Sequence, residues 1–355
     1  MTTIISFIFL LGVLIFVHEL GHFLAARSVG MRVEKFYLGF NLFGLGLHKK
    51  WGDTEYGIGL FPLGGYVKVS GILDESFDDS ATGAPYEYQS KKSWQQIWFA
   101  SAGVIMNFLL AIIIFTIITL KMGIGEVDNS PVIGQVLPDY PAYDTGLVED
   151  DEIISVNGVN INNWDEMTSI IQPIIEEQVI IEWLHDGIIL KDSVITKVSE
   201  NIVSGKVVKV GMIGISKKIN LREATIIESV QEGFRRTIFW FLVIVDSIKM
   251  LITGEASLKD VGGPIMIAQL TGESVKSGLL SFFNLMAIIS INLAFLNILP
   301  IPALDGGHII ISLTEGIIRR KLPVKIKLGF QQIGVVLMLL LFVVVMFNDI
   351  SRLFN

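Results

Sequence analysis

The sequence predicts a polytopic α-helical membrane protein with about four transmembrane helices, membrane-associated β-structure and a small extracytoplasmic α+β domain. The 355 residues are 51% hydrophobic and only 17% charged, and their mean hydropathy is +0.60, which is outside the range of ordinary soluble domains. A helix needs about 20 consecutive apolar residues to cross the hydrocarbon core of a bilayer. Four segments approach or exceed that length: residues 1–26, 94–121, 281–317 and 328–348.

The first apolar segment is predicted to be a retained membrane span. An apolar stretch at an N-terminus is also typical of a signal peptide, but this one lacks the basic residues that begin such peptides. It also carries the sequence His18-Glu19-Leu20-Gly21-His22. Polar residues of this kind inside a span indicate function rather than targeting.

Basic residues predict the orientation of the spans, because Lys and Arg accumulate in cytoplasmic loops. Arg27 follows the first span, Lys91 precedes the second, and a basic cluster at residues 319–327 separates the third from the fourth. Residues 122–228 instead contain 18 Asp and Glu against 7 Lys and Arg. We therefore expect this acidic region and both termini to lie outside the cytoplasm.

Two further regions are expected to lie at membrane surfaces. Residues 27–93 are predicted to be cytoplasmic, and the stretch 33–60 within them alternates short strands with glycine-rich turns. Residues 222–280 are predicted to be an amphipathic connector at the interface, because an aspartate and a lysine interrupt its apolar stretch 237–252.

Residues 127–218 are predicted to form the small α+β domain. A strand-like stretch, a small-residue turn, an alternating strand and a closing Asn-Gly turn follow one another at residues 131–138, 140–147, 151–156 and 157–158. This pattern resembles a bacterial PDZ domain, with Thr145 in place of the usual alanine and Asp150 in place of a glycine. The resemblance implies a peptide ligand added to a sheet edge; the alternative is a β-rich spacer without a ligand.

His18, Glu19 and His22 predict hydrolytic chemistry inside the membrane. Histidines four residues apart lie on one face of a helix and can bind one Zn²⁺, and the adjacent glutamate can accept a proton from water. Cysteine is absent, so a metal must be held by His, Asp or Glu. The net charge of -8 argues against nucleic acid as a partner.

A third ligand is expected from the sequence NILPIPALDGG, residues 297–307. Catalytic zinc sites usually have three protein ligands. A carboxylate in an apolar span is costly unless it has a partner, and two prolines break the helix before Asp305. Asp305 is therefore predicted to complete the site with the two histidines. Asn297 is expected either to hold a substrate carbonyl or oxyanion or to be a plain helix cap.

These motifs together resemble the site-2 protease family of intramembrane zinc metalloproteases, and within it the bacterial regulator-of-sigma-E-protease type. The resemblance covers essentially the whole chain. It implies that His18, His22 and Asp305 bind Zn²⁺. It also implies that Glu19 activates water, and that the active site lies towards the cytoplasmic side of the bacterial inner membrane.

The same resemblance implies a substrate. It would be the transmembrane segment of a single-span protein, such as an anti-sigma factor already shortened outside the membrane or a remnant signal peptide. A re-entrant β-hairpin and a strand containing Gly64 and Gly65 would pair with the unwound segment, unless these two glycines merely form a turn. The PDZ-like domain would exclude substrates with a large extracytoplasmic part.

Two other functions remain open on the sequence alone. Intramembrane His and Asp residues on a broken helix also describe a metal or proton transporter, although no inverted repeat is evident. A catalytically inactive zinc-binding homologue is the other alternative.

Overall fold

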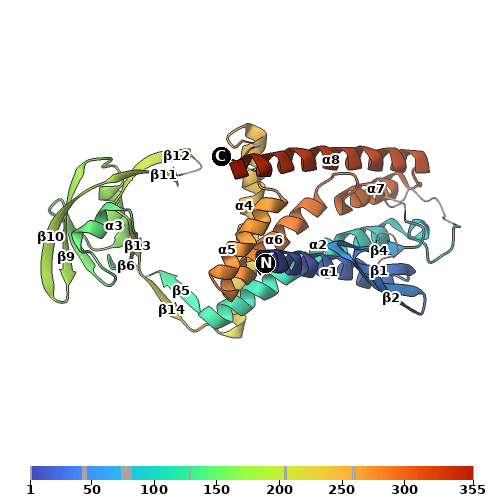
Figure 1. The fold of residues 1–355 in the computed structure, drawn as a ribbon, viewed down its shortest axis with the longest axis horizontal. Helices are drawn as coiled ribbons and strands as arrows, with labels where there is room; N and C mark the ends of the chain where they lie inside the picture. The colour runs from blue at the N-terminus through green and yellow to red at the C-terminus, as the bar shows by residue number, and fades with distance from the viewer. Residues whose placement is uncertain are drawn as a thin grey trace. The chain divides into compact units, whose positions relative to one another are not determined.

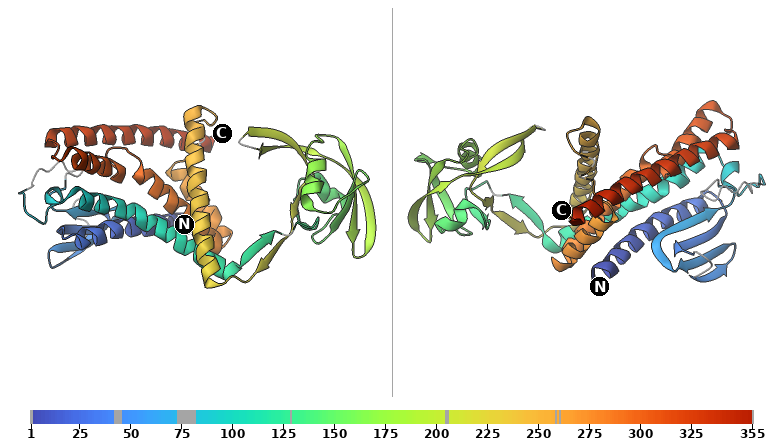
Figure 2. Two further views of the ribbon diagram at one scale, coloured as in Figure 1. Left: turned by 180° about the vertical axis from the view of Figure 1, so that it is seen from behind. Right: turned by 45° about the horizontal axis from the view of Figure 1, so that its top comes forward.

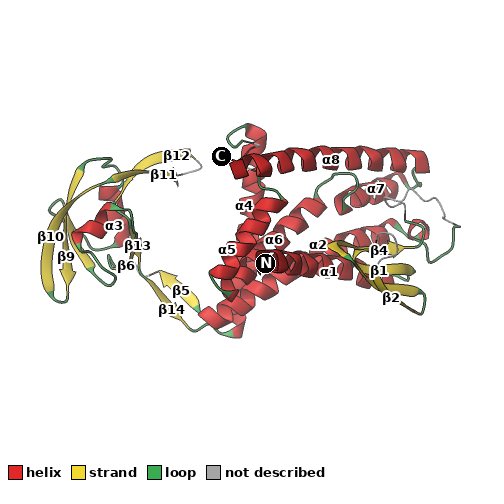
Figure 3. Ribbon diagram, viewed as in Figure 1, coloured by secondary structure: helices red, strands yellow, loops and turns green. Residues whose placement is uncertain are grey.

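The chain forms two compact units, which we call the helical unit and the β-rich unit (Figures 1 and 3). The helical unit comprises Met1–Lys121 and Thr225–Asn355, and the β-rich unit comprises Met122–Ala224. The computed structural model describes residues 2–41, 46–72, 82–127, 129–203, 206–257, 259 and 261–354.

Seven helices make up most of the described helical unit: α1 (Thr2–Ser28), α2 (Ser93–Met122), α4 (Ile226–Thr253), α5 (Pro264–Lys276), α6 (Leu279–Ile298), α7 (Asp305–Ile318) and α8 (Val324–Phe354). Of these, α1, α2, α6 and α8 are long and apolar enough to cross a membrane. The prediction of about four such helices is therefore confirmed.

Helices α1, α2 and α6 share one apolar core. Leu10 and Leu14 of α1 pack with Ala111 and Phe115 of α2 and with Ile291 of α6, and all five are fully buried. The outer faces of the same helices remain apolar, since Ile5 and Ile113 are exposed. Apolar side chains on both faces suit helices surrounded by lipid.

The third apolar segment consists of two helices separated by an irregular turn. Helix α6 ends at Ile298 and α7 begins at Asp305. The two prolines in between cannot donate backbone hydrogen bonds, and Ala303 takes a positive φ of 72°. A side chain at Gly306 would collide with the backbone of Leu299, so the turn is tight because glycine begins the next helix.

The connector between the β-rich unit and α6 consists of α4 and α5. Helix α4 begins with a capping box formed by Thr225 and Glu228, and Figure 2 shows it running across the direction of the neighbouring helices. Helix α5 begins after Gly263, where the buried carboxylate of Asp349 in α8 accepts backbone hydrogen bonds from Gly263 and Ile265, both at 2.8 Å. This contact ties α5 to α8.

A four-stranded sheet follows α1, with the order β2-β3-β1-β4. Its strands are β1 (Val33–Phe40), β2 (Gly46–Trp51), β3 (Thr54–Gly59) and β4 (Phe61–Val69). Strands β2 and β3 form a hairpin, while β1 pairs with β3 in parallel and with β4 antiparallel. The β-structure is therefore larger than the single hairpin and neighbouring strand expected from the sequence, because β1 joins the hairpin to β4. Strand β4 packs against α1.

The β-rich unit has a separate apolar core. Its described strands form a four-stranded sheet of order β10-β9-β7-β8 and three strand pairs, β11-β12, β13-β6 and β14-β5, and the short helix α3 packs against β7. The bounds of these elements are β5 (Ile124–Val127), β6 (Ile133–Val136), β7 (Glu152–Val156), β8 (Val159–Asn160), α3 (Trp164–Ile171), β9 (Gln178–His185), β10 (Ile188–Ile195), β11 (Lys197–Val203), β12 (Lys206–Met212), β13 (Ile215–Lys217) and β14 (Ile219–Arg222). Ile133, Ile153 and Trp183 lie in the core. Asn157 and Gly158 both take positive φ values, as the turn between β7 and β8 requires.

Candidate active site

His18, His22 and Asp305 bring three ligand atoms together. The Nε2 atoms of the two histidines are 3.1 Å apart. Oδ2 of Asp305 lies 3.2 Å from Nε2 of His18 and 3.3 Å from Nε2 of His22. Among the described residues, this is the group of at least three His and acidic side chains whose ligand atoms converge closely enough to hold one metal ion.

The spacing of these atoms fits a zinc ion. Tetrahedral zinc at about 2.0–2.1 Å from nitrogen and oxygen ligands would separate those ligands by about 3.3–3.4 Å, close to the observed 3.1–3.3 Å. Oδ2 of Asp305 is also buried without a hydrogen-bond partner of suitable geometry, an arrangement that a cation would stabilise. Two imidazoles and one carboxylate are a donor set typical of catalytic zinc.

The two elements that supply these ligands are positioned differently. His18 and His22 follow one another by one turn on α1, so helical geometry alone aligns them. Asp305 is the first residue of α7, and the irregular turn after α6 delivers it to the histidines. A continuous helix through residues 298–305 would place the carboxylate elsewhere, so the break in the third segment is part of the site.

Helix α2 approaches the histidines closely because glycines line the contact. A side chain at Gly21 would meet the backbone of Ala102, and one at Gly103 would lie 2.5 Å from Nε2 of His22 and 2.6 Å from Cε1 of His18. The backbone carbonyl of Phe99 lies 2.9 Å from Nδ1 of His22. That carbonyl can accept the Nδ1 proton of His22 and leave Nε2 free as a ligand.

Glu19 lies beside the three ligands and against β4. It is half-buried, and the backbone amide of Val67 faces its carboxylate. A side chain at Gly65 would lie 3.3 Å from Cγ of Glu19 and 2.9 Å from the carbonyl oxygen of Tyr37. Glycine at this position therefore lets β4 pass close to the carboxylate.

The predicted substrate-binding residues Gly64, Gly65 and Asn297 lie on two different elements. Gly64 and Gly65 lie inside β4, so the turn considered as their alternative is wrong. Gly64 has a φ of 142°, which an L-residue rarely adopts. Asn297 is half-buried in the last turn of α6. This position is compatible with both a substrate contact and a helix cap, so both interpretations of Asn297 stay predictions.

Three contributors to the site carry little or no signal in the sequence. The carbonyl of Phe99 and the amide of Val67 are backbone groups; every residue type supplies the carbonyl, and every type except proline supplies the amide N–H. Gly103 lies among small residues in α2. Only its contact with the two imidazoles shows that this position requires glycine.

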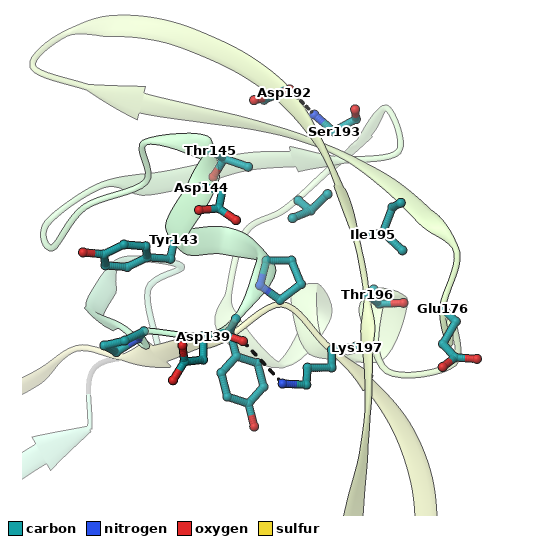
Figure 4. A pocket seen from close by; sticks show the side chains of 14 residues that line it. Asp139, Tyr143, Asp144, Thr145, Glu176, Asp192, Ser193, Ile195, Thr196 and Lys197 are labelled. Carbon is teal, nitrogen blue, oxygen red and sulfur yellow. Dashed lines mark hydrogen bonds between the residues drawn. The ribbon is translucent and has the colours of Figure 1, made fainter.

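The β-rich unit contains a cavity without a comparable cluster. A cavity of about 1040 Å³ is lined by residues from 138–145, 192–197 and Glu176 (Figure 4). Nζ of Lys197 lies 3.4 Å from the backbone carbonyl of Asp139 across it. The lining includes no histidine. Among the described residues, the His18 cluster rather than this cavity is therefore the candidate metal site.

The chain is similar over most of its length to a known peptidase family and to named zinc metalloproteases. The family model for peptidase family M50 matches residues 6–341. A "Putative zinc metalloprotease" of Clostridium acetobutylicum is 34% identical over 96% of this chain and 94% of its own length. "Zinc metalloprotease RasP" of Bacillus licheniformis is 29% identical over the full length of both chains. The solved PDZ domain of the SdrC-like protein from Listeria monocytogenes matches with a TM-score of 0.21 and 20% identity, over 26% of this chain and 93% of that domain.

Proposed function

Because the chain belongs to peptidase family M50 and is a zinc metalloprotease, we propose that it hydrolyses peptide bonds within transmembrane segments of single-span proteins. The observation that carries this proposal is the triangle of ligand atoms from His18, His22 and Asp305, with Glu19 beside it. These groups lie on helices of a multi-pass membrane architecture. A substrate that reaches them must itself enter the membrane.

Each site residue has a defined task in this proposal. His18, His22 and Asp305 hold the zinc ion, which when bound supplies Lewis acidity towards water and the scissile carbonyl. Glu19 accepts a proton from the attacking water and returns it to the leaving amine. The amide of Asn297 donates a hydrogen bond to the substrate carbonyl and to the oxyanion that develops from it.

Strand β4 is the proposed docking edge for the substrate. A transmembrane helix shields its peptide bonds by internal hydrogen bonds, so it must be extended before attack. Among the described strands, β4 ends the order of its sheet and pairs only with β1, which leaves one edge for strand addition. Gly64 and Gly65 on this strand would let the extended substrate come close to Glu19.

We propose that the active site lies towards the cytoplasmic side of a bacterial inner membrane and that the β-rich unit lies outside the cytoplasm. The basic flanks of the spans and the acidic character of residues 122–228 support this orientation. A PDZ-like β-rich unit would then exclude substrates with large extracytoplasmic parts, and would admit shortened anti-sigma factors and remnant signal peptides. A variant without residues 127–218 should cleave the unshortened substrate; an uncut substrate would contradict this filter.

The Glu19→Gln variant tests the central proposal. It keeps the shape of the side chain and removes the base, so the purified protein should retain one zinc per chain. Cleavage of a model transmembrane substrate should fall by about 10²- to 10⁴-fold. Undiminished cleavage would show that Glu19 is not the base. Zinc flux into proteoliposomes without cleavage by the unaltered protein would favour a transporter, and zinc binding with neither activity would favour an inactive homologue.

A further inference from the structure

The buried amide of Asn107 in α2 lies against the imidazole of His18. Its Nδ2 is 3.3 Å from Nδ1 of His18, and the residue is fully buried. Its other terminal atom, Oδ1, is buried and has no hydrogen-bond partner among the described residues. An unpaired buried acceptor beside a proposed metal ligand requires a physical explanation.

The two terminal atoms of an amide exchange places when the side chain makes a half-turn about its last bond. With Nδ2 towards His18, the amide donates to Nδ1 and the ring keeps its proton on Nε2. That proton occupies the lone pair that faces Asp305 and that a metal would need. With Oδ1 towards His18, the amide accepts a proton from Nδ1, and Nε2 is free to act as a ligand.

We propose that Asn107 is a positioning residue that fixes the metal-binding tautomer of His18 through an Nδ1–H to Oδ1 hydrogen bond. This inference rests on the proposed zinc site. It gives His18 the same kind of support that the carbonyl of Phe99, at 2.9 Å from Nδ1, gives His22. Each histidine then has one α2 acceptor behind it, so α2 orients both rings while contributing no metal ligand of its own.

Two contacts beside Asn107 pack α2 against its neighbours without touching its side-chain amide. Its backbone carbonyl accepts a hydrogen bond of 2.8 Å from the hydroxyl of Ser290 in α6, which is also fully buried. Gly103, one turn earlier on α2, lets the helix approach both rings. The side-chain amide of Asn107 therefore faces His18 at a point where α2 packs between α1 and α6.

Three variants in the full-length protein test the proposal. Asn107→Asp keeps an acceptor of nearly the same size, Asn107→Leu removes all hydrogen bonding, and Ser290→Ala removes a neighbouring contact without touching the amide. The readouts are the zinc dissociation constant, measured by chelator competition, and the visible absorption spectrum of the Co²⁺-substituted protein. Size-exclusion chromatography in detergent reports folding, and Asn107→Ala replaces the leucine variant if that variant aggregates.

Loss of the acceptor should weaken zinc binding by about 10- to 100-fold in Asn107→Leu and should alter the Co²⁺ spectrum. Asn107→Asp should stay within about threefold of the unaltered protein, as should Ser290→Ala. Equal losses in Asn107→Asp and Asn107→Leu would overturn the proposal, because the amide would then act as a donor or as packing. Unchanged binding in Asn107→Leu would overturn it as well. If the unaltered protein binds no zinc, the proposed function fails instead.

Discussion

The core of the β-rich unit and helix α8 of the helical unit bury different kinds of side chain. In the β-rich unit, apolar residues such as Ile133 and Ile153 are fully buried. In α8 of the helical unit, the buried residues are polar or glycine: Lys327, Gln331, Gly334, Asn348 and Asp349. On the same helix, the apolar residues Leu340 and Val343 are 61% and 63% exposed.

This difference shows which solvent the β-rich unit and helix α8 each suit. Burial of apolar surface drives folding in water, whereas lipid is as apolar as leucine and gives no such drive between helices. Polar groups in lipid must instead find partners inside the helix bundle. The interior of the helical unit is therefore where charged and metal-binding groups can gather, and the proposed active site lies there.

The largest effect is expected from a substitution in the apolar core of the β-rich unit. Ile153→Ala removes three methyl or methylene groups from a fully buried position in β7 and should destabilise the β-rich unit by about 2–5 kcal/mol. Ile189→Ala, at a position in β10 that is 64% exposed, should change stability by no more than about 0.5 kcal/mol. Hydrogen exchange in peptides from β7 and β9 measures both. Similar exchange in the two variants would contradict the assignment of this core.

The second effect tests the close approach of α2 to His18 and His22. A methyl group at Gly103 would press on both imidazoles, so Gly103→Ala should weaken zinc binding by about 10- to 100-fold. Gly12→Ala is the matched control, because a side chain at Gly12 meets nothing within 4 Å. Chelator competition compares the two dissociation constants. Equal zinc affinity in the two variants would mean that α2 shifts to accept the methyl group without disturbing the zinc ligands.

A smaller effect concerns a buried carboxylate that accepts hydrogen bonds from the first turn of α5. Asp349 accepts backbone hydrogen bonds from Gly263, Ile265 and Met266 at 2.8–3.2 Å, so Asp349→Ala should destabilise the start of α5 by about 1–2 kcal/mol. Faster hydrogen exchange within residues 264–276 is the measurement, with zinc content unchanged. Asp246→Ala, on an exposed part of α4, should leave that exchange unaltered.

The smallest effect is a pH dependence in the β-rich unit. The hydrogen bond from His185 to the buried carboxylate of Asp151, 2.7 Å long, raises the pKa of His185 above its usual 6.5. A raised pKa in the folded state means that this stabilisation is complete below pH 6.5 and is lost as the pH rises through the folded pKa. The thermal unfolding midpoint of the β-rich unit should therefore decrease slightly as the pH is raised beyond 6.5. His185→Gln should remove this slope, and a persistent slope would point to another group.

Local sequence was sufficient to predict parts of the helical unit. The length and hydropathy of the spans predicted four membrane helices, because a bilayer imposes a minimum apolar length. The spacing of His18 and His22 predicted their common face, because the helix repeat fixes it. Proline pairs predicted a break before Asp305, because proline cannot continue the hydrogen-bond ladder.

Other features depended on contacts between distant segments. The four-stranded sheet was not predicted, because β1 pairs with strands on both sides that only the folded chain brings together. The amide of Val67 beside Glu19 and the carbonyl of Phe99 beside His22 were not predicted either. Apart from the missing N–H of proline, backbone groups are the same in every residue and leave no pattern in the sequence.

The sequence by itself determined the membrane class, the pair of histidines with Glu19 between them, and the identity of the distant carboxylate. These depend on composition and on spacing within single helices. Only the tertiary structure decided that Asp305 meets both histidines at 3.2–3.3 Å, that Gly103 gives α2 room beside them, and that Asn107 stands behind His18. Distances between helices depend on how their side chains pack, and that packing is a property of several segments together.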